Sequence, residues 1–184
     1  MLKKKLLTIA GVVGILACGA CFLPPIHNGP PSPPPPLPLP QLHGIRTVRV
    51  IVTDNSIPAH IDTQFMAIAV VKYINLLSAN DGIAAHAGGD PADADLTIAI
   101  SNERAALKQV EPFDGSESWL FEFTFSESLK NANGMILKQR SNIPVRVTYT
   151  LQAKHSADVW NVPNAREQYG LSLSYRATQG VFFQ

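Results

Sequence analysis

The sequence predicts an α+β fold, a single domain with a mostly antiparallel or mixed β-sheet of four to six strands and one main helix packed on one face. Two observations support this prediction. Short segments rich in β-branched and aromatic residues alternate apolar and polar positions, as strands with one buried face do. One longer segment, residues 62–79, instead gathers its polar side chains on a single stripe of a helix.

The predicted domain comprises residues 44–184, a length that buries enough surface to fold without disulfides. It contains no cysteine. Without Lys3, Lys4 and Lys5, which precede the domain, the chain carries 12 basic and 14 acidic residues, a net charge of −2. This balance argues against nucleic acid as a partner.

Residues 1–17 have the layout of a signal peptide. The basic start MLKKK is followed by an apolar stretch from Leu6 to Ala17. This stretch is too short to cross a bilayer of about 30 Å as a helix. We therefore exclude it from the fold.

The two cysteines of the chain, Cys18 and Cys21, allow three interpretations. The sequence ILA before Cys18 resembles a bacterial lipobox, in which the cysteine thiol receives a diacylglyceryl group. Cys21 fits this pattern less well, because its third preceding residue is itself a cysteine. A redox or zinc CxxC site lacks a second ligand pair, and an ordinary cleaved signal that leaves Cys21 free or paired is the third interpretation.

Lipid attachment at Cys18 would place the protein in the cell envelope. Gly19 follows it, and the absence of aspartate there favours the outer membrane, facing the periplasm. The rest of the segment 18–43 is proline-rich, with ten prolines in residues 24–40. At ~3.1 Å per residue, a polyproline II segment of this length spans roughly 50 Å. A tether is the favoured interpretation, and a ligand for an aromatic-lined domain is the alternative.

Within the domain, IRTVRVIVT (Ile45–Thr53) predicts the first strand, and the helix 62–79 ends at Asn80-Asp81-Gly82. The short apolar IAAHA and the loop GGDPADAD lead to the strand LTIAIS, which continues irregularly to about Val110. WLFEFTFSESLK (119–130) is the strongest strand, and NANG (131–134) predicts a type I′ hairpin turn. MILKQRSN, PVRVTYTLQA and LSLSYRA predict the remaining strands, so the expected order is β-α-β-β-β-β with a weakly patterned end.

We expect no catalytic residue, cofactor or metal site. The five histidines do not have metal-ligand spacing on any one element; they are His27, His43, His60, His86 and His155. No nucleophile elbow or phosphate-binding glycine loop is present. The acidic residues Asp90, Asp93 and Asp95 lack the spacing of a calcium loop, and a solvated loop is the simpler interpretation.

Two further clusters have a functional and a structural interpretation. The alternating aromatic residues Trp119, Phe121, Phe123 and Phe125 predict a core face, with a binding surface as the alternative. Basic residues surround the predicted hairpin and could form a patch for an anionic lipid or sugar phosphate, or a solvated strand face; they are Lys130, Lys138, Arg140 and Arg146.

The chain resembles the lipopolysaccharide-assembly lipoproteins of the LptE type. IRTVRVIVTDNS resembles their first strand, ADADLTIAIS the strand after the helix, and FEFTFSESLKNANGMILKQRS their hairpin. The resemblance implies a non-enzymatic component of an outer-membrane β-barrel translocon that helps to deliver lipopolysaccharide. It also implies a C-terminal helix on the sheet, where the sequence LSLSYRATQGVFFQ itself predicts a strand. The alternative function is a tethered periplasmic binding or scaffolding lipoprotein of unknown ligand.

Overall fold

A computed structural model describes residues 42–182 except 79–80 and 153–157. The predicted signal peptide, Cys18, Cys21 and the proline-rich segment lie outside these residues. The described residues form a five-stranded sheet in the order β2-β1-β3-β4-β5. The strands are β1 (Thr47–Asp54), β2 (Ala84–Ala87), β3 (Ala94–Val110), β4 (Glu117–Asn131) and β5 (Ile136–Leu151).

The sheet is mixed, and the fold is α+β as the sequence predicts. β1 runs parallel to both of its neighbours, β2 and β3. β3, β4 and β5 follow one another as antiparallel hairpin partners. Parallel pairing requires a crossover connection, and α1 (Thr63–Leu77) supplies it between β1 and β2.

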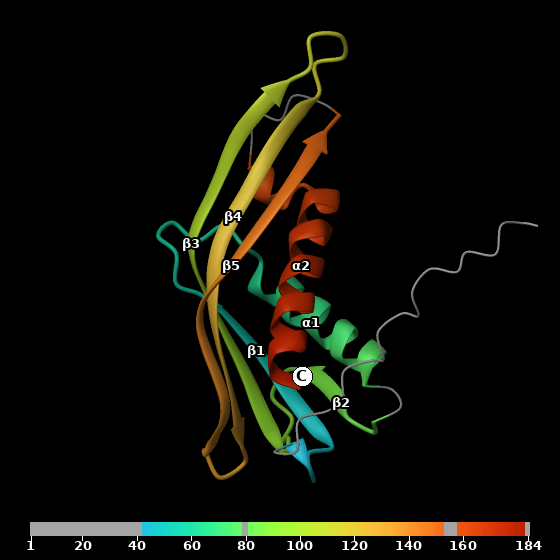
Figure 1. The fold of residues 1–184 in the computed structure, drawn as a ribbon, viewed down its shortest axis with the longest axis vertical. Coiled ribbons are helices and arrows are strands. Elements are labelled where there is room, and N and C mark those ends of the chain that lie inside the picture. Colours follow the sequence, from blue (N-terminus) through green and yellow to red (C-terminus); the bar gives the residue numbers. More distant parts are fainter. Residues whose placement is uncertain (1–41, 79–80, 153–157, 183–184) are drawn as a thin grey trace, which may run out of the picture. The chain divides into compact units, whose positions relative to one another are not determined.

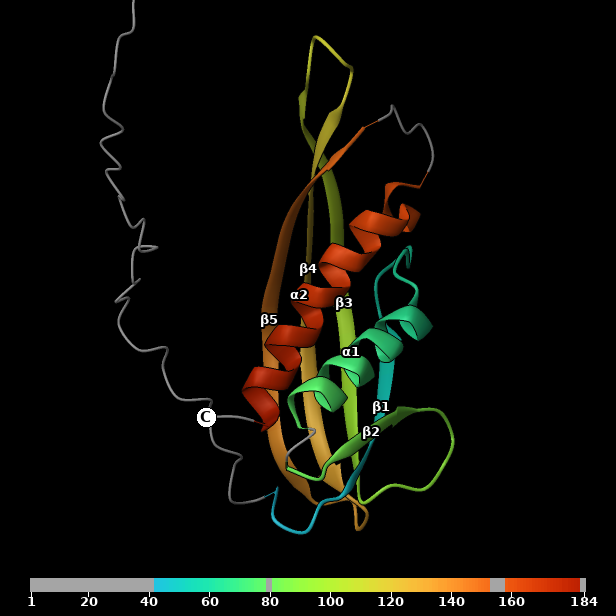
Figure 2. The same ribbon diagram turned by 90° about the vertical axis from the view of Figure 1, so that its right-hand side faces the viewer.

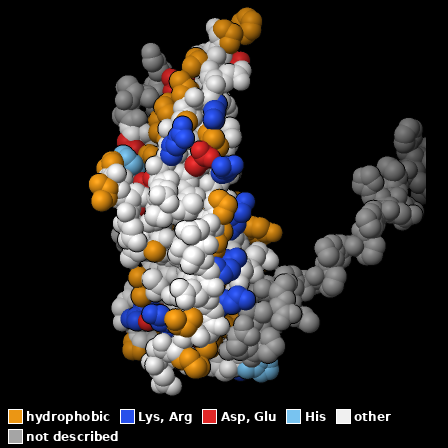
Figure 3. Space-filling view, turned by 60° about the vertical axis from the view of Figure 1, so that its left-hand side comes forward, with side chains coloured by type: hydrophobic (Ala, Val, Ile, Leu, Met, Phe, Trp, Pro, Cys, Tyr) orange, Lys and Arg blue, Asp and Glu red, His pale blue; other side chains and the backbone are white. Residues whose placement is uncertain are grey.

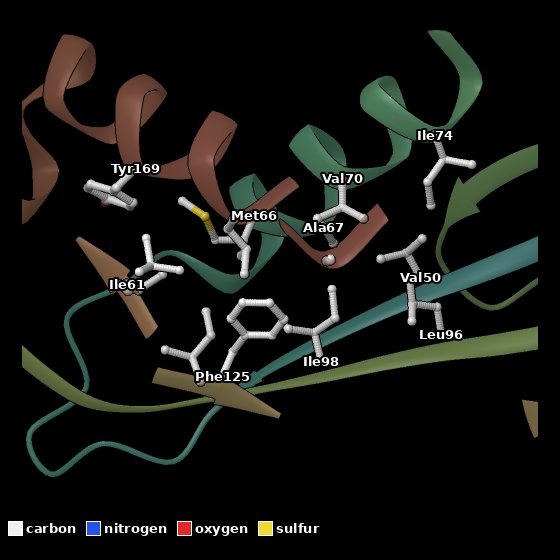
Figure 4. Packing of buried hydrophobic residues seen from close by; sticks show 14 of the residues in the cluster. Val50, Ile61, Met66, Ala67, Val70, Ile74, Leu96, Ile98, Phe125 and Tyr169 are labelled. Atoms are coloured by element: carbon white, nitrogen blue, oxygen red, sulfur yellow. The ribbon is translucent and has the colours of Figure 1, made fainter. Parts of the chain in front are cut away.

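Two helices cover one face of the sheet (Figures 1 and 2). α1 lies over β1 and β2, while α2 (Pro163–Phe182) lies beside α1 and packs mainly on β5 and β4. A short 3-10 helix, Val159–Asn161, precedes α2. Met66, Val70 and Ile74 of α1 point toward the strands, where they meet buried side chains such as Leu96 and Ile98 (Figure 4).

The predicted helix 62–79 is confirmed as α1. Asp62 is its N-cap residue, and its carboxylate accepts a hydrogen bond from the Phe65 amide at 3.0 Å. The Ser78 amide donates to the Ile74 carbonyl at 2.8 Å and ends the helix. Side-chain capping of this kind satisfies backbone groups that a helix end leaves unpaired.

The expected strand LSLSYRA is wrong, because residues 171–177 belong to α2. Leu171, Leu173 and Tyr175 alternate like a strand, but the buried side chains recur every fourth residue, which is helical spacing; they include Ala165, Tyr169, Leu173, Ala177 and Val181. Pro163 at the first helical position suits a helix start. In the described residues, a second helix therefore lies on the sheet beside α1.

Two smaller expectations also differ from the structure. MILKQRSN and PVRVTYTLQA contribute most of their residues to one continuous strand, β5 (Ile136–Leu151), which contains Pro144 and an irregularity at Asn142. The NANG turn is not type I′, since Gly134 has a φ of 80° while Asn133 does not have a positive φ. The Asn131 amide donates to the Met135 carbonyl and the Gly134 amide to the Asn131 carbonyl, a three-residue loop closed by glycine.

The predicted core face of β4 is confirmed. Phe121, Phe123 and Phe125 are buried beneath the helices, and Trp119 is partly buried at the end of the row. Phe121 packs edge-on against Trp160, with ring centroids 5.1 Å apart. The aromatic row therefore joins the sheet to the segment that leads into α2.

We expect Phe121→Ala to lower the free energy of unfolding by about 3–5 kcal/mol, because it opens a cavity in this core. Urea denaturation of the purified protein measures the change. Phe113→Ala is the matched control, since Phe113 is 98% exposed in the β3–β4 loop, and it should cost less than about 0.5 kcal/mol. Equal losses in the two variants would contradict this account of the core.

Candidate functional site

The four basic residues of the predicted patch do not lie on one face of the sheet. Lys138 and Arg140 are on the helix-covered side, where they are opposite Leu129 and Glu127. Arg146 is on the open side and pairs with Glu122 at 2.8 Å. Lys130, which alternates with buried Leu129, also points to the open side. Anion binding by the four as one patch is therefore not supported by their positions.

Arg140 forms an internal ion pair with Glu127. The Glu127 side chain is fully buried, and burial raises its pKa to about 7 although Arg140 opposes this rise. Arg140 Nη2 also donates to the Arg176 carbonyl of α2 at 2.6 Å. Gly180 makes room for the guanidinium, since a Cβ at this position would lie 1.6 Å from Arg140 Cζ. The pair thus connects the C-terminal half of α2 to β4 and β5.

At pH 8 we expect Arg140→Leu to lower the free energy of unfolding by about 3 kcal/mol, because it leaves the buried Glu127 carboxylate without a partner. Arg146→Leu is the matched control. It breaks an ion pair whose arginine side chain is 75% exposed, and such pairs contribute less than about 1 kcal/mol. Chemical denaturation compares the two variants, and a loss of similar size in both would exclude the anchoring role of Arg140.

Two neighbouring acidic residues, Glu103 and Asp54, hold the loop between β1 and α1. The Glu103 carboxyl oxygens accept hydrogen bonds from the backbone amides of His60 at 2.9 Å and Ile61 at 3.3 Å. Burial, followed by the hydrogen bond with Asp54, raises the pKa of Glu103 to about 8. Burial also acts to raise the pKa of Asp54, but hydrogen bonds from Glu103 and Ser56 outweigh it and lower that pKa. Near neutral pH a proton on Glu103 therefore removes its repulsion with the negatively charged Asp54.

The raised pKa of Glu103 makes the free energy of unfolding depend on pH. Because the pKa of Glu103 in the folded protein lies above the ordinary value of 4.5, its stabilising effect is complete below pH 4.5. It is lost as the pH rises toward and through about 8. Glu103→Gln removes the titratable proton and keeps one of the two acceptor oxygens, so we expect a smaller fall in stability between pH 5 and pH 8.5. Urea denaturation at both pH values tests this, and an unchanged fall in the variant would refute it.

The acidic loop is used within the fold. Asp93 accepts hydrogen bonds from the Arg46 and Thr47 amides at 2.8 and 2.9 Å, and Asp95 pairs with Arg49 at 2.7 Å. Among the described residues, no group of three or more His, Cys, Asp or Glu side chains is arranged to hold a metal ion. Within the same residues, no helix is long and apolar enough to span a membrane.

The open face of the sheet is polar. It carries short hydroxyl side chains, such as Ser101 bonded to Thr124 at 3.1 Å and Ser118 bonded to Thr150 at 2.9 Å. Charged pairs lie toward its ends. Figure 3 shows mostly white, uncharged polar and backbone atoms in the middle of this face, with orange hydrophobic atoms at the upper end.

The outer side of the helix layer carries the strongest candidate for a binding surface. Between α1 and α2 lies an apolar groove of about 360 Å³, lined by residues that include Phe65, Ile68, Tyr73, Leu76 and Leu171. Leu76 is 73% exposed. Tyr73 packs edge-on against Tyr175 of α2, with ring centroids 6.3 Å apart. We name this surface the α1–α2 groove; Lys72 and Glu167 are its charged members.

Sequence reasoning missed the groove and the buried ion pair for different reasons. The groove requires α2 to be a helix, which the strand-like LSLSYRA pattern concealed. Glu127 did give a signal, because it occupies an inward position in the alternating row from Phe121 to Leu129. A charged residue at such a position predicts a buried partner, and Arg140 is that partner.

Comparison with known proteins gives weak likenesses of structure alone. No protein-family model and no curated protein matches the sequence. The PelC dodecamer of Paraburkholderia phytofirmans is 11% identical, with 80% of this chain and 94% of that chain covered, at a TM-score of 0.39. The minor lipoprotein of Acinetobacter baumannii is 11% identical, with 73% of this chain and 91% of that chain covered, at a TM-score of 0.39. Lipoprotein B of Nitrosomonas europaea is 9% identical, with 72% of this chain and 79% of that chain covered, at a TM-score of 0.39.

Several of the similar solved structures are thus bacterial lipoproteins. None of these three is described as a lipopolysaccharide-assembly protein. With TM-scores below 0.5, the likenesses do not assign a fold family or a function to this chain.

Proposed function

We propose that the protein is a non-enzymatic, lipid-anchored binding module of the cell envelope, which contacts its partner through the α1–α2 groove. The observation that carries this proposal is the apolar groove on the solvent side of the helix layer. Contiguous exposed apolar surface is uncommon on monomeric proteins and is typical of interaction sites. The lipobox-like sequence before Cys18 supports the anchor.

A more specific candidate is a role beside an outer-membrane β-barrel in lipopolysaccharide assembly. The observation in its favour is α2. The resemblance to the LptE-type lipoproteins implies a C-terminal helix packed on the sheet, and the chain has one where its own pattern predicted a strand. The structural likenesses add nothing to this candidate.

A crosslinked pull-down from envelope membranes tests both levels of the proposal. We expect the full-length protein to sediment with membranes and to recover a defined partner by mass spectrometry. Leu171→Arg places a charge in the α1–α2 groove and should reduce recovery at least tenfold. Phe113→Arg, which changes an exposed apolar side chain far from the groove along the sequence, is the matched control and should recover the partner normally.

The outcomes separate the alternatives. A large outer-membrane barrel among the recovered proteins supports the assembly role. Recovery of another partner without a barrel supports only the general binding module. Equal recovery with Leu171→Arg and Phe113→Arg rules out the groove. Membrane fractionation tests the anchor, with Cys18→Ala and Cys21→Ala as parallel variants. If the Cys18→Ala protein stays with the membranes as the wild type does, lipid attachment at Cys18 is ruled out.

A further inference from the structure

β1 has an edge that the sheet leaves open. On one side it pairs with β3 from Val48 to Asp54. On the other side β2 pairs with it only from Thr47 to Val50. Gly88, with a φ of 126°, follows β2 and takes the chain out of the strand. Figure 2 shows β2 beside the lower part of β1 only.

The backbone of this edge faces outward at alternate residues. The Asn55 amide donates to the Ile100 carbonyl, and the Asp93 amide donates to the Thr47 carbonyl, so odd-numbered residues of β1 face β3. Even-numbered residues face β2, as the bond from the Ala84 amide to the Arg46 carbonyl shows. Beyond Val50, the N–H and C=O groups of Val52 therefore point to the open edge. The described part of the chain gives them no strand partner there.

A hollow of about 470 Å³ continues the track of β2 along this edge. Ile51 and Val52 of β1 line it from the sheet, and Ala67 and Ile68 line it from α1. Ile68 is 41% exposed. Figure 4 shows Ala67 pointing from α1 toward Val50 of β1. An additional strand in line with β2 would thus place apolar side chains beneath α1, as β2 does with buried Ala85.

The outer edges of β2 and β5, at the two ends of the strand order, are protected. The Asn75 side chain of α1 receives a bond from the Ala85 amide at 2.6 Å and donates to the Ala85 carbonyl at 3.0 Å. This imitates a neighbouring strand and closes the outer side of β2. β5 contains Pro144 and an irregularity at Asn142, whose φ is 55°. Proline and bulges are common devices that prevent strand addition.

We propose that the edge Ile51–Asp54 of β1 binds an extended peptide segment of a partner protein as an added strand. Outward backbone groups at Val52 select an extended main chain, and the hollow under α1 accepts an apolar side chain from every second residue of the segment. The proline-rich residues 24–40 of this chain do not suit the edge, because proline has no N–H to donate. The proposal concerns another surface than the α1–α2 groove, although Ile68 borders both.

The test uses the full-length protein in detergent and a fluorescein-labelled peptide, Lys-Thr-Val-Thr-Val-Thr-Lys. Its twin is N-methylated at every amide between the two lysines, so it keeps the side chains without the N–H donors. We expect the peptide to bind saturably by fluorescence anisotropy, and the twin at least tenfold more weakly. Hydrogen–deuterium exchange read by mass spectrometry should slow across residues 50–54 when the peptide is bound.

Val52→Pro tests the edge from the protein side. It removes an outward N–H and leaves the odd-numbered residues that pair with β3, so affinity should fall at least tenfold. Leu171→Arg, in the α1–α2 groove alone, should leave it unchanged. If Val52→Pro does not fold, the affinities of the wild-type protein for the two peptides test the proposal instead.

Three results would overturn the proposal. The first is no saturable binding up to millimolar peptide, and the second is equal affinity for the N-methylated twin. The third is protection of residues 50–54 that rises with protein concentration in the absence of peptide, which would show that a second copy occupies the edge. Because neither peptide requires the groove or the anchor, failure here leaves the proposed function standing.

Discussion

Packing of Trp160 and Tyr169 against Phe121 and Phe123 is the interaction on which the arrangement of the domain depends. Tyr169 lies 5.9 and 6.2 Å from the two phenylalanine rings, between centroids, and Trp160 lies 5.5 Å from Tyr169. The buried Tyr169 hydroxyl donates to the Trp160 carbonyl at 2.7 Å, which satisfies the hydroxyl donor. This cluster fixes α2 on the long strands, and the position of α2 in turn defines the groove it shares with α1.

The strands were predictable because one buried face imposes alternation, and most of them follow that rule within a few residues. α2 was not, since Leu171, Leu173 and Tyr175 alternate as a strand would. The buried residues of α2 recur at helical spacing, but this spacing favours a helix only because β4 and β5 form a surface on which α2 can pack. Local pattern favoured the strand, and tertiary packing decided for the helix.

The candidate surfaces were harder to predict for a geometric reason. The basic residues are close in sequence, but strand alternation and the irregularities of β5 send them to opposite faces of the sheet. The open edge of β1 depends on where β2 ends, which Gly88 determines through its backbone rather than through hydropathy. Neither property can be read from spacing along a single element. Glu127 is the exception, because a charge within a buried row is visible in the sequence.

Both proposed surfaces use α1 as a wall, and Ile68 borders each of them. The remaining contacts of α1 are those of a fixed helix: Asp62 caps its start, Ser78 caps its end, and Met66, Val70 and Ile74 are buried. A helix held at both ends and along its inner face presents its two flanks in constant positions. An occupant of the open β1 edge would cover one side of Ile68 and an occupant of the groove the other. Each would add apolar contact area to the same side chain without competing for backbone groups. In both proposals α1 is therefore the shared wall, and the sheet and α2 support it.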